Sequence, residues 1–458
     1  MITVPRRLHF VGIGGIGMSA IARVLLEEGY SISGSDLKTS SLTDRLAALG
    51  AVIYEGHIGD NVGNAEMVIY SSAVPQDNPE LVEGLRRSLP VVKRADVLGW
   101  LMGRQFSVAV AGTHGKTTTS SMLSLIALDA GLDPTILVGG ELANLDTNAR
   151  SGKGRVLVAE ADEFDGTFLK LKPNIAVVTN IEPDHLDFYK TFDNIVDAFY
   201  RFMDSVPGDG HIVASLDDDT VRSFVERGSG GGRMITYGLL GRGQWQAVDV
   251  SVNNAGGQDF RVELAGKAYG EFSLLVPGRH NVSNALAAIA VSNLLGVSPD
   301  SARQTLLRFQ GARRRFESKG DFRGVPVIDD YAHHPTEVRA TLRAARERFP
   351  GRRLVCIFQP HTYSRTKYLL AEFAKCFDDA DVVVISDIYA SRERDTLGIS
   401  SADLVSVMHH ANVRHIASLN DIAEWLTTSL DKDDVLLTLG AGDIGKVGEL
   451  VLEYGRLS

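Results

Sequence analysis

The sequence predicts an α/β protein built from three domains, at residues 1–104, 105–308 and 309–458. Its 458 residues are enough for roughly three domains of ordinary size. Short apolar strand patterns alternate with amphipathic helix patterns in the first half of the chain and again in its last third, as in α/β folds. Two glycine-rich turns, at residues 12–17 and 112–115, each lead from a strand pattern into a helix pattern. Such a turn points backbone N–H groups at an anion, so both are candidate phosphate sites.

The composition narrows the class of protein. Hydrophobic residues make up 44% of the chain and charged residues 23%, so we expect a large packed core. The formal net charge of −10 argues against a nucleic-acid groove. Two cysteines, Cys356 and Cys376, form no metal or disulfide pattern and predict apolar packing in a reducing cytoplasm. We find no signal-peptide pattern and no apolar stretch long enough for a bilayer, so we expect no membrane insertion.

The first domain opens with the pattern of a dinucleotide-binding fold. A strand at residues 8–13 runs into the turn Gly12-Ile13-Gly14-Gly15-Ile16-Gly17, and the helix after it ends at Gly29. A second strand at residues 31–34 leads to Asp36, an acid near the offset expected for a ribose contact. We therefore expect a Rossmann-like domain. These residues by themselves allow a nicotinamide cofactor, the diphosphate of a nucleotide sugar, or a unit that binds nothing.

Three further polar residues lie near the predicted ligand edge of this first sheet. Ser71 and Ser72 end a strand at residues 67–71, where ligands of such sheets bind. His57, in a Glu-Gly-His segment, is more typical of a loop histidine than of a ligand.

The second domain begins with a triphosphate-binding pattern. A strand at residues 106–111 runs into Gly112-Thr113-His114-Gly115-Lys116-Thr117-Thr118, and a helix follows to residue 130. Strand, glycine loop, Lys-Thr and helix together predict the phosphate cradle of a nucleoside-triphosphate enzyme. Lys116 would reach the β- and γ-phosphates and Thr117 would bind Mg²⁺. Gly112 takes the place of the first glycine of the general motif, which would fall at Val110, so the loop is shorter.

Acidic residues follow the next two strands of this domain. Glu160, Asp162 and Glu163 come directly after a strand at residues 155–159, and Glu160 is the best candidate Mg²⁺ ligand. His185 lies among acids after a strand at residues 174–180, which suits a second metal position.

The end of the second domain changes character. Alternating patterns between residues 248 and 275 predict a small antiparallel insert. Asn281 and Asn284, spaced i and i+3, share one face of the helix that follows. By themselves they allow either recognition of an adenine edge or capping of that helix by Asn281.

The third domain is a further α/β unit with polar clusters at its strand ends. Strands are expected at residues 325–328, 354–358, 381–385 and 435–439, and a helix at 335–349. Arginines and histidines at several strand ends of one sheet predict a site for an anionic partner. The clusters lie at residues 313–317, 329–335, 359–365 and 440–443.

The motifs taken together, and in this order, closely resemble the Mur ligases over nearly the whole chain. They are most similar to the alanine-adding branch of that family, and the opening Gly-Ile-Gly-Gly-Ile-Gly-Met is less similar to the branch that recycles murein peptides. The motifs that carry the resemblance are Gly12–Met18, Ala111–Thr118, Glu160–Glu163, Asn180–Asp187, Gly278–Asn281, Asp329–Pro335 and Gln359–His361.

The resemblance implies an ATP-dependent ligase of peptidoglycan precursor synthesis. It would join L-alanine to the lactyl carboxylate of UDP-N-acetylmuramate through an acyl phosphate, releasing ADP and phosphate in the cytoplasm. Two Mg²⁺ ions are implied, with Mn²⁺ able to replace them, and the chain would be a monomer or a homodimer. The alternatives are a murein-peptide recycling ligase, a nicotinamide-dependent dehydrogenase, which leaves the Gly-Lys-Thr loop unexplained, and a nucleotide-gated regulator, which leaves the third domain's clusters unexplained.

The resemblance also assigns roles residue by residue. The UDP-sugar site would comprise Gly14, Gly15, Ile16, Gly17, Asp36, His57, Ser71 and Ser72. The ATP site would comprise Gly112, Thr113, His114, Gly115, Lys116, Thr117, Thr118, Asn281, Asn284, Arg315 and Asp330. L-Alanine would meet Tyr331, His333, His361 and Arg365; the metal ligands would be Thr117, Glu160 and His185; and the catalytic set would be Lys116, His185, His333 and Arg365.

Two positions depart from the wider family. Many Mur ligases carry a carbamylated lysine about fifteen residues after the metal-site histidine, whereas residues 198–202 here are Ala-Phe-Tyr-Arg-Phe. The Gln-Pro-His loop often continues with arginine, but here Thr362 follows. The completion of the second metal site and one anion contact therefore stay open.

Overall fold

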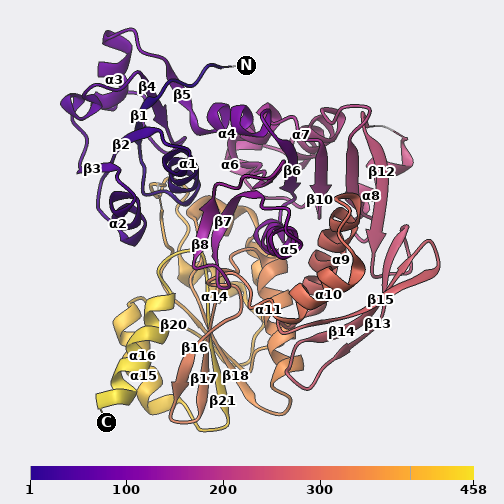
Figure 1. The fold of residues 1–458 in the computed structure, drawn as a ribbon. Coiled ribbons are helices and arrows are strands. Elements are labelled where there is room, and N and C mark those ends of the chain that lie inside the picture. Colours follow the sequence, from indigo (N-terminus) through magenta and orange to yellow (C-terminus); the bar gives the residue numbers. More distant parts are fainter. Residues whose placement is uncertain (1, 229, 392, 458) are drawn as a thin grey trace.

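The computed structural model describes residues 2–228, 230–391 and 393–457. It contains three β-sheets, each flanked by helices, which follow one another along the chain from indigo to yellow in Figure 1. The first and second sheets lie in the upper part of that view and the third lies below them. The predicted class, α/β with three domains, is confirmed.

The first sheet is parallel, and its strand order is β3-β2-β1-β4-β5. This is the strand order of a Rossmann-like sheet. Such sheets bind ligands in the crevice where the strand order reverses, which here lies between β1 and β4. The strands are β1 (Arg7–Val11), β2 (Ser31–Asp36), β3 (Val52–Glu55), β4 (Met67–Tyr70) and β5 (Val91–Lys93). The helices are α1 (Ile16–Glu27), α2 (Ser41–Ala48), η1 (Gly59–Val62), α3 (Pro79–Arg86) and α4 (Arg94–Met102).

The second sheet has ten strands in the order β15-β14-β13-β12-β11-β10-β6-β9-β7-β8. Its strands are β6 (Phe106–Ala111), β7 (Thr135–Leu142), β8 (Thr147–Arg150), β9 (Val156–Glu160), β10 (Ile175–Val178), β11 (His211–Ser215), β12 (Arg233–Gly238), β13 (Trp245–Val252), β14 (Gln258–Leu264) and β15 (Lys267–Leu274). Its helices are α5 (Lys116–Asp129), η2 (Phe164–Lys170), α6 (Leu186–Tyr189), α7 (Phe192–Asp204), α8 (Asp219–Glu226), α9 (Arg279–Leu294) and α10 (Pro299–Leu307).

The antiparallel strands β13, β14 and β15 are present as predicted, but they do not form a separate sheet. The start of β13 pairs in parallel with the end of β12, Tyr237 opposite Trp245, so the insert continues the central sheet. The predicted antiparallel insert is confirmed, and it joins the central sheet because the edge of β12 offers unpaired backbone groups that the next strand satisfies.

The third sheet has six strands in the order β16-β17-β21-β18-β19-β20, with β16 antiparallel at one edge. The strands are β16 (Glu317–Phe322), β17 (Val325–Asp330), β18 (Arg353–Phe358), β19 (Val382–Ile385), β20 (Val413–His415) and β21 (Asp434–Leu439). The helices are α11 (Pro335–Arg348), α12 (Tyr363–Tyr368), α13 (Leu370–Phe373), α14 (Ser401–Val407), α15 (Leu419–Ser429) and α16 (Gly445–Leu457).

The central strand β6 shows how the sequence builds the core. Alternate residues of a strand face opposite sides of its sheet. Val108 and Val110 pack in one buried cluster with side chains of α5 and α9, whereas Ala109 and Ala111 belong to the cluster that holds side chains of α7. Because both faces are covered, β6 is apolar from Val108 to Ala111, and the polar loop follows at its carboxyl end.

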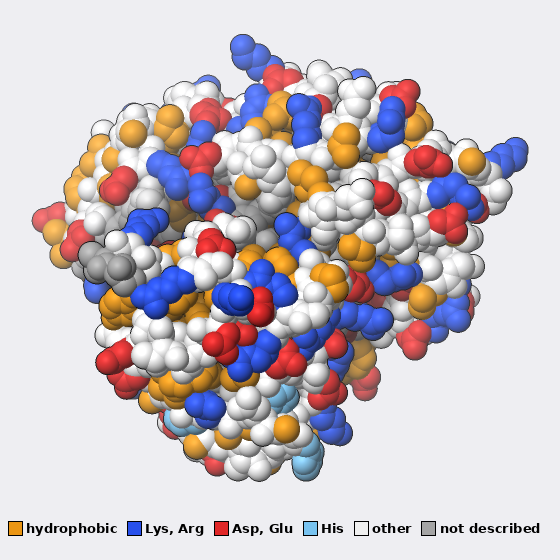
Figure 2. Space-filling model, turned by 90° about the horizontal axis from the view of Figure 1, so that it is seen from below, with side chains coloured by type: hydrophobic (Ala, Val, Ile, Leu, Met, Phe, Trp, Pro, Cys, Tyr) orange, Lys and Arg blue, Asp and Glu red, His pale blue; other side chains and the backbone are white. Residues whose placement is uncertain are grey.

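Both cysteines lie in the third domain's core as free thiols, and burial raises the pKa of each thiol. Their predicted role as small apolar residues is confirmed. On the face seen in Figure 2, acidic and basic side chains are interspersed rather than gathered by sign. Among the described residues, no helix combines the length and apolar character needed to cross a membrane.

Candidate active site

A cavity of about 710 Å³ lies where the three domains meet. The first domain contributes its glycine turn, the second its phosphate loop, and the third the ends of its strands. Predicted site residues that line the cavity are Gly15, Ile16, Gly17, Ser71, Ser72, Thr113, His114, Gly115, Lys116, Thr117, Glu160, His185, Arg315, Tyr331 and His333. Residues far apart in the sequence therefore meet in one site.

The phosphate loop is held open by its neighbours. Gly112 and Gly115 have φ of 136° and 81°, and a Cβ on Gly115 would collide with the side chain of Asn284. The Asn180 side chain accepts from the backbone N–H of His114 at 2.8 Å, and the Thr179 hydroxyl donates to the His114 carbonyl at 2.6 Å. Glycine at these two positions follows from backbone geometry, so the shorter loop still forms a cradle.

Lys116 lies inside the cavity and is paired with an acid. Its Nζ donates to both carboxylate oxygens of Glu163, at 2.9 and 2.7 Å, and to the Gly112 carbonyl at 2.7 Å. Burial alone would lower the pKa of Lys116, but Glu163, Asp162 and Glu160 outweigh it and hold the pKa above its usual range. The ammonium is therefore charged at every physiological pH.

Two oxygen donors beside Lys116 are arranged for a divalent cation. The Thr117 hydroxyl lies 3.0 Å from Glu160 Oε2, and the same oxygen accepts from the Gly139 backbone N–H at 2.8 Å. Neighbouring oxygens in an octahedral Mg²⁺ shell, with bonds of ~2.1 Å, lie about 3 Å apart. Thr117 and Glu160 therefore fit two adjacent Mg²⁺ ligands.

His185 lies on the other side of the loop. It has φ of 50° and caps α6, and its Nε2 is 3.7 Å from Asp184 Oδ2. The lysine expected from the resemblance would fall in α7, where Ala198, Phe199 and Phe202 are buried in the core. A second metal position at His185 must therefore draw on other groups, such as Asp184.

Two residues predicted for the first domain's site, Asp36 and His57, do not line the cavity. The Asp36 carboxylate accepts from the Gly14 backbone N–H at 2.8 Å, which fixes the turn. His57 Nδ1 lies 2.9 Å from Ser35 Oγ and 3.1 Å from Glu80 Oε2. The cavity instead holds Arg94, which was not predicted and lies 4.0 Å from Asp162. Lys93-Arg94 at the end of β5 is the signal that could have identified it.

The third domain brings Arg315, Tyr331 and His333 to the cavity. The Arg315 guanidinium lies over the Tyr331 ring at 5.2 Å. Asp330 does not line the cavity: its two oxygens accept from the backbone N–H groups of Phe316 and Ala332 at 2.8 and 2.7 Å. Burial raises the pKa of Asp330 to about 6.

His333 is a neutral imidazole in this site. Burial, reinforced by the charge of Arg365, outweighs the nearby Glu337 and lowers the pKa of His333 to about 3. Its Nδ1 lies 2.9 Å from the Tyr331 carbonyl oxygen. A carbonyl can only accept a hydrogen bond, so Nδ1 carries the hydrogen. The lone pair is therefore on Nε2.

A smaller cavity of about 90 Å³ adjoins the main one and shares Phe164, Asp184 and His185 with it. His361 and Arg365 line this second space. Arg365 is buried and makes a two-pronged pair with Asp184, Nε to Oδ1 at 2.9 Å and Nη2 to Oδ2 at 3.1 Å. The predicted alanine site is therefore divided between two connected cavities.

Thr362 stands where the resemblance leads one to expect arginine, and its side chain is hydrogen-bonded to Glu393. Its hydroxyl donates to Glu393 Oε1 at 2.5 Å, and the backbone N–H of Ser364 donates to Glu393 Oε2 at 2.9 Å. This position therefore offers no cation of its own to an anionic ligand.

Asn281 and Asn284 lie on one face of α9, as the spacing predicted. Gly278 is the N-cap, so the alternative of capping by Asn281 was wrong. The Asn281 amide donates to the Pro277 carbonyl at 2.7 Å, and the Asn284 amide donates to Asn281 Oδ1 at 3.3 Å. Both are buried below Gly115 and neither lines the main cavity. The structure leaves their predicted adenine contact untested.

His114, predicted only as part of the phosphate loop, is enclosed by acids. Its Nδ1 lies 3.2 Å from Glu337 Oε1 and its Nε2 lies 3.7 Å from Glu182 Oε2. Burial alone would lower the pKa of His114, but these two carboxylates raise it to about 9. Glu182 and Glu337 were not predicted, because a lone glutamate in a loop or at a helix start carries no distinguishing pattern.

Three family models cover the chain in order. The catalytic domain of the Mur ligase family matches residues 7–106, the Mur ligase middle domain residues 110–292, and the Mur ligase glutamate ligase domain residues 314–442.

Individual proteins agree with these models. The chain is 46% identical, over 98% of both chains, to the UDP-N-acetylmuramate–L-alanine ligase of Caldanaerobacter subterraneus subsp. tengcongensis. Its fold matches the solved UDP-N-acetylmuramate–alanine ligase of Thermotoga maritima, with a TM-score of 0.82 and 32% identity over 98% of this chain and 99% of that one. It also matches a murein peptide ligase of Psychrobacter arcticus, with a TM-score of 0.76 and 24% identity over 98% and 99%, which shows the fold alone. The chain belongs to the Mur ligase family.

Proposed function

We propose that this protein joins L-alanine to the lactyl carboxylate of UDP-N-acetylmuramate at the cost of ATP, a step of peptidoglycan precursor synthesis. The observation that carries the proposal is the 46% identity, over 98% of both chains, to a protein of that name. The match to a murein peptide ligase at 24% identity supports no more than a common fold. The buried free thiols support a cytoplasmic setting.

Each domain would bind one substrate. Residues 1–104 would hold the UDP sugar, residues 105–308 ATP, and residues 309–458 L-alanine. The main cavity supports this division, because the glycine turn, the phosphate loop and the third domain's His333 all open into it. Asp36 would act indirectly, by shaping the turn that receives the diphosphate.

The phosphate loop would prepare ATP for transfer of its γ-phosphoryl group. Backbone N–H groups and the Lys116 ammonium would bind the phosphates, and Lys116 would exchange Glu163 for them. Thr117 and Glu160 would hold Mg²⁺, which when bound neutralises charge on the transferring group. His185 would support a second ion.

The reaction would pass through an acyl phosphate. A lactyl carboxylate oxygen attacks the γ-phosphorus and ADP leaves with the electrons of the broken P–O bond. The neutral amine of L-alanine then attacks the acyl carbon, inorganic phosphate leaves, and the amine nitrogen loses a proton. His333 is the candidate acceptor, because its Nε2 carries a lone pair; at a pKa of about 3 it is a weak base, so it would take the proton only as the new C–N bond forms and makes the nitrogen more acidic.

The test is phosphate release with each substrate in turn. We expect release only when ATP, UDP-N-acetylmuramate and an amino acid are all present, with L-alanine preferred over serine and glycine. Oxygen-18 placed in the lactyl carboxylate should appear in the released phosphate. Release with a murein peptide but not with L-alanine would favour the recycling ligase, and release without UDP-N-acetylmuramate would overturn both assignments.

A further inference from the structure

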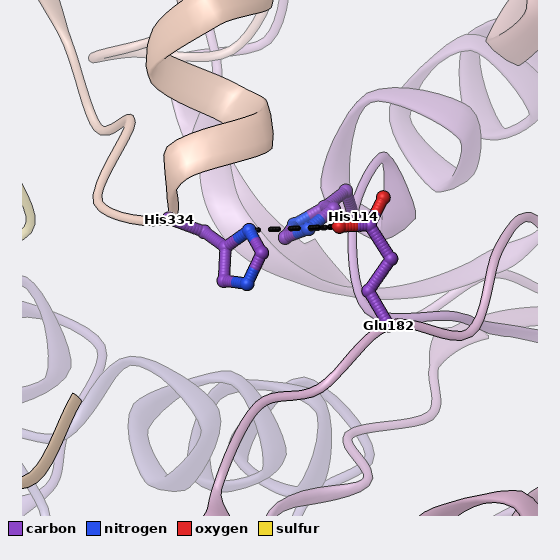
Figure 3. A group of neighbouring side chains, drawn as sticks. All are labelled: His114, Glu182 and His334. Carbon is purple, nitrogen blue, oxygen red and sulfur yellow. Dashed lines mark ion pairs between the residues drawn. The ribbon is translucent and has the colours of Figure 1, made fainter. Parts of the chain in front are cut away.

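Two histidines and a glutamate converge between the phosphate loop and the third domain. His114 comes from the phosphate loop, Glu182 from the segment after β10, and His334 from the N-cap of α11. One ligand atom from each lies within 4.8 Å of the other two. Figure 3 shows both imidazole rings directed toward the Glu182 carboxylate.

Each histidine uses its other ring nitrogen on an oxygen outside the group. His114 Nδ1 lies 3.2 Å from Glu337 Oε1, and His334 Nε2 lies 3.1 Å from the Pro183 carbonyl. Metal-binding histidines almost always donate their second N–H to such a carboxylate or carbonyl, which fixes the ring and its tautomer. The nitrogens left for an ion are His114 Nε2 and His334 Nδ1; because two carboxylates raise the pKa of His114 to about 9, binding of an ion releases a proton from this ring.

These two nitrogens face the same oxygen. His114 Nε2 and His334 Nδ1 each lie 3.7 Å from Glu182 Oε2. A tetrahedral ion with bonds of ~2.0–2.1 Å holds its ligands about 3.4 Å apart, so each separation needs to shorten by only a few tenths of an ångström. His114 Nε2 is also buried without a hydrogen-bond partner, which is costly for a polar atom.

An ion would displace one existing contact, because an imidazole nitrogen has a single lone pair and His334 Nδ1 already accepts from the Thr336 backbone N–H. His334 Nδ1 accepts a long bond, 3.3 Å, from the Thr336 backbone N–H, and Glu182 Oε2 accepts from the Thr336 hydroxyl at 2.6 Å. A carboxylate oxygen has more than one lone pair, so the hydroxyl bond can remain while Glu182 binds an ion.

We propose that His114, Glu182 and His334 form a binding site for one divalent transition-metal ion of the Zn²⁺ or Co²⁺ class. Two imidazoles and a carboxylate suit such an ion, whereas Mg²⁺ prefers the oxygen donors Thr117 and Glu160. The site is therefore separate in ligand chemistry from the proposed magnesium site, and it does not depend on the proposed reaction.

The position of the site gives it a consequence. His114 and Glu182 belong to the second domain and His334 to the third, so a bound ion ties the phosphate loop to the third domain. We expect binding to raise the thermal midpoint of the protein and to slow any reaction that requires these domains to separate.

The experiment uses Co²⁺ as the probe. Full-length protein is freed of metal with a chelator and titrated with Co²⁺ while Mg²⁺ is kept in large excess, so that the oxygen sites hold Mg²⁺. We expect one Co²⁺ per chain, with the intense visible absorption of a four-coordinate ion, and displacement of Co²⁺ by Zn²⁺.

Variants locate the ion. His334→Asn keeps a side chain that can cap α11 but removes the imidazole, and Glu182→Gln removes the charge. We expect each to weaken Co²⁺ binding by more than the ~10–100-fold that loss of an outer-shell partner costs, which is the effect expected of Glu337→Gln. His415→Gln, at a surface histidine paired with Asp387, is the matched control and should bind as the parent does.

The outcomes are distinct. No Co²⁺ binding in the presence of Mg²⁺ would overturn the proposal and leave the group as an ion-pair network of His114 with its two carboxylates. Binding with unchanged affinity and spectrum in both His334→Asn and Glu182→Gln would also overturn it, since the ion would then lie elsewhere. Because two variants and a spectrum are used, one variant that fails to fold does not spoil the test.

Discussion

Lys116 shows how much of the site depends on single residues. Its ammonium is buried beside Glu163, which is itself almost inaccessible to solvent. Glu163 holds the Lys116 ammonium in the phosphate loop before ATP binds, and a phosphate of ATP would then take the place of Glu163. Removing Lys116 would remove the main charge that opposes the γ-phosphate and would leave Glu163 without its partner.

We predict that Lys116→Ala lowers turnover by on the order of 10²–10³-fold or more, because a preorganised cation on the transferring group is lost. Binding of UDP-N-acetylmuramate, measured by calorimetry, should change little, since the glycine turn is in another domain. Lys446→Ala, at an exposed lysine paired with Asp443, is the control. Near-parental phosphate release by Lys116→Ala would contradict the assignment.

Glu80, a buried carboxylate in the first domain, links the stability of that domain to pH. It is inaccessible to solvent and accepts from Ser35 and Asn61, and two histidines lie within 3.6 Å of it. Burial alone would raise the pKa of Glu80, but the nearby His9 ring and the hydrogen bonds from Ser35 and Asn61 outweigh it and lower the pKa to about 2. The carboxylate therefore favours folding wherever it is ionised.

We predict that the first domain loses stability as the pH falls from about 4.5 toward about 2. A folded-state pKa below the unfolded value contributes fully above the unfolded pKa and is lost on the way down to the folded one. Glu80→Gln should lower the unfolding midpoint at pH 7 and flatten this acid limb, as followed by circular dichroism. Glu83→Gln, which removes a solvent-screened pair with Arg86 on the same helix α3, should flatten the limb much less than Glu80→Gln, and the same slope in both variants would refute the role of Glu80.

At the scale of elements, the unit β6–loop–α5 follows most closely from the sequence. Glycines at 112 and 115 mark the loop, Gly131 follows the last turn of α5, and an apolar strand pattern precedes them, so β6 was predicted with its observed bounds. The antiparallel strands were predicted as elements but not in their attachment to β12. Periodicity within a strand reports which face is buried and says nothing about which edge it joins.

Tertiary contacts, both within the first domain and between domains, were the part of the site that could not be predicted from the sequence. Asp36 was assigned to a ligand because acids at that offset contact ribose, yet its carboxylate holds the turn at Gly14. Glu337 and Arg94 were missed because their contacts with His114 and Asp162 form only where separate domains meet.

We predict that Gly115→Ala destabilises the protein more than Gly131→Ala. Both glycines have φ near 80°, which costs an alanine about 1–2 kcal/mol. A Cβ at Gly131 meets open space, whereas a Cβ at Gly115 collides with Asn284. Thermal midpoints and nucleotide affinity measure the difference, and only Gly115→Ala should weaken nucleotide binding. Equal effects would mean that the Asn284 contact is unimportant.

At the scale of the whole molecule, the third domain is joined to the second through buried charges. Arg365 and Asp184 form the most enclosed of these pairs, with side chains 9% and 8% exposed. Removing one partner of a buried pair leaves an uncompensated charge and typically costs 3–5 kcal/mol. The contact between the two domains therefore depends strongly on Asp184.

We predict that Asp184→Asn loosens the third domain from the second. Hydrogen exchange should accelerate at residues 183–187 and in α12, and small-angle scattering should report a larger mean radius. Asp387→Asn, which removes a partly exposed pair with His415, should have neither effect, because surface pairs contribute little. Unchanged exchange in Asp184→Asn would show that other contacts hold the domains.

The unbroken hydrogen-bonded ladder from β8 to β15 bears on protein engineering. The sequence of strands β13 to β15 suggests an insert that could be removed. Deleting them would leave β12 without its neighbour β13 and would expose unpaired backbone N–H and C=O groups to other molecules. A shortened version would then be prone to self-association, so a minimal catalytic core of this ligase has to retain the outer hairpins.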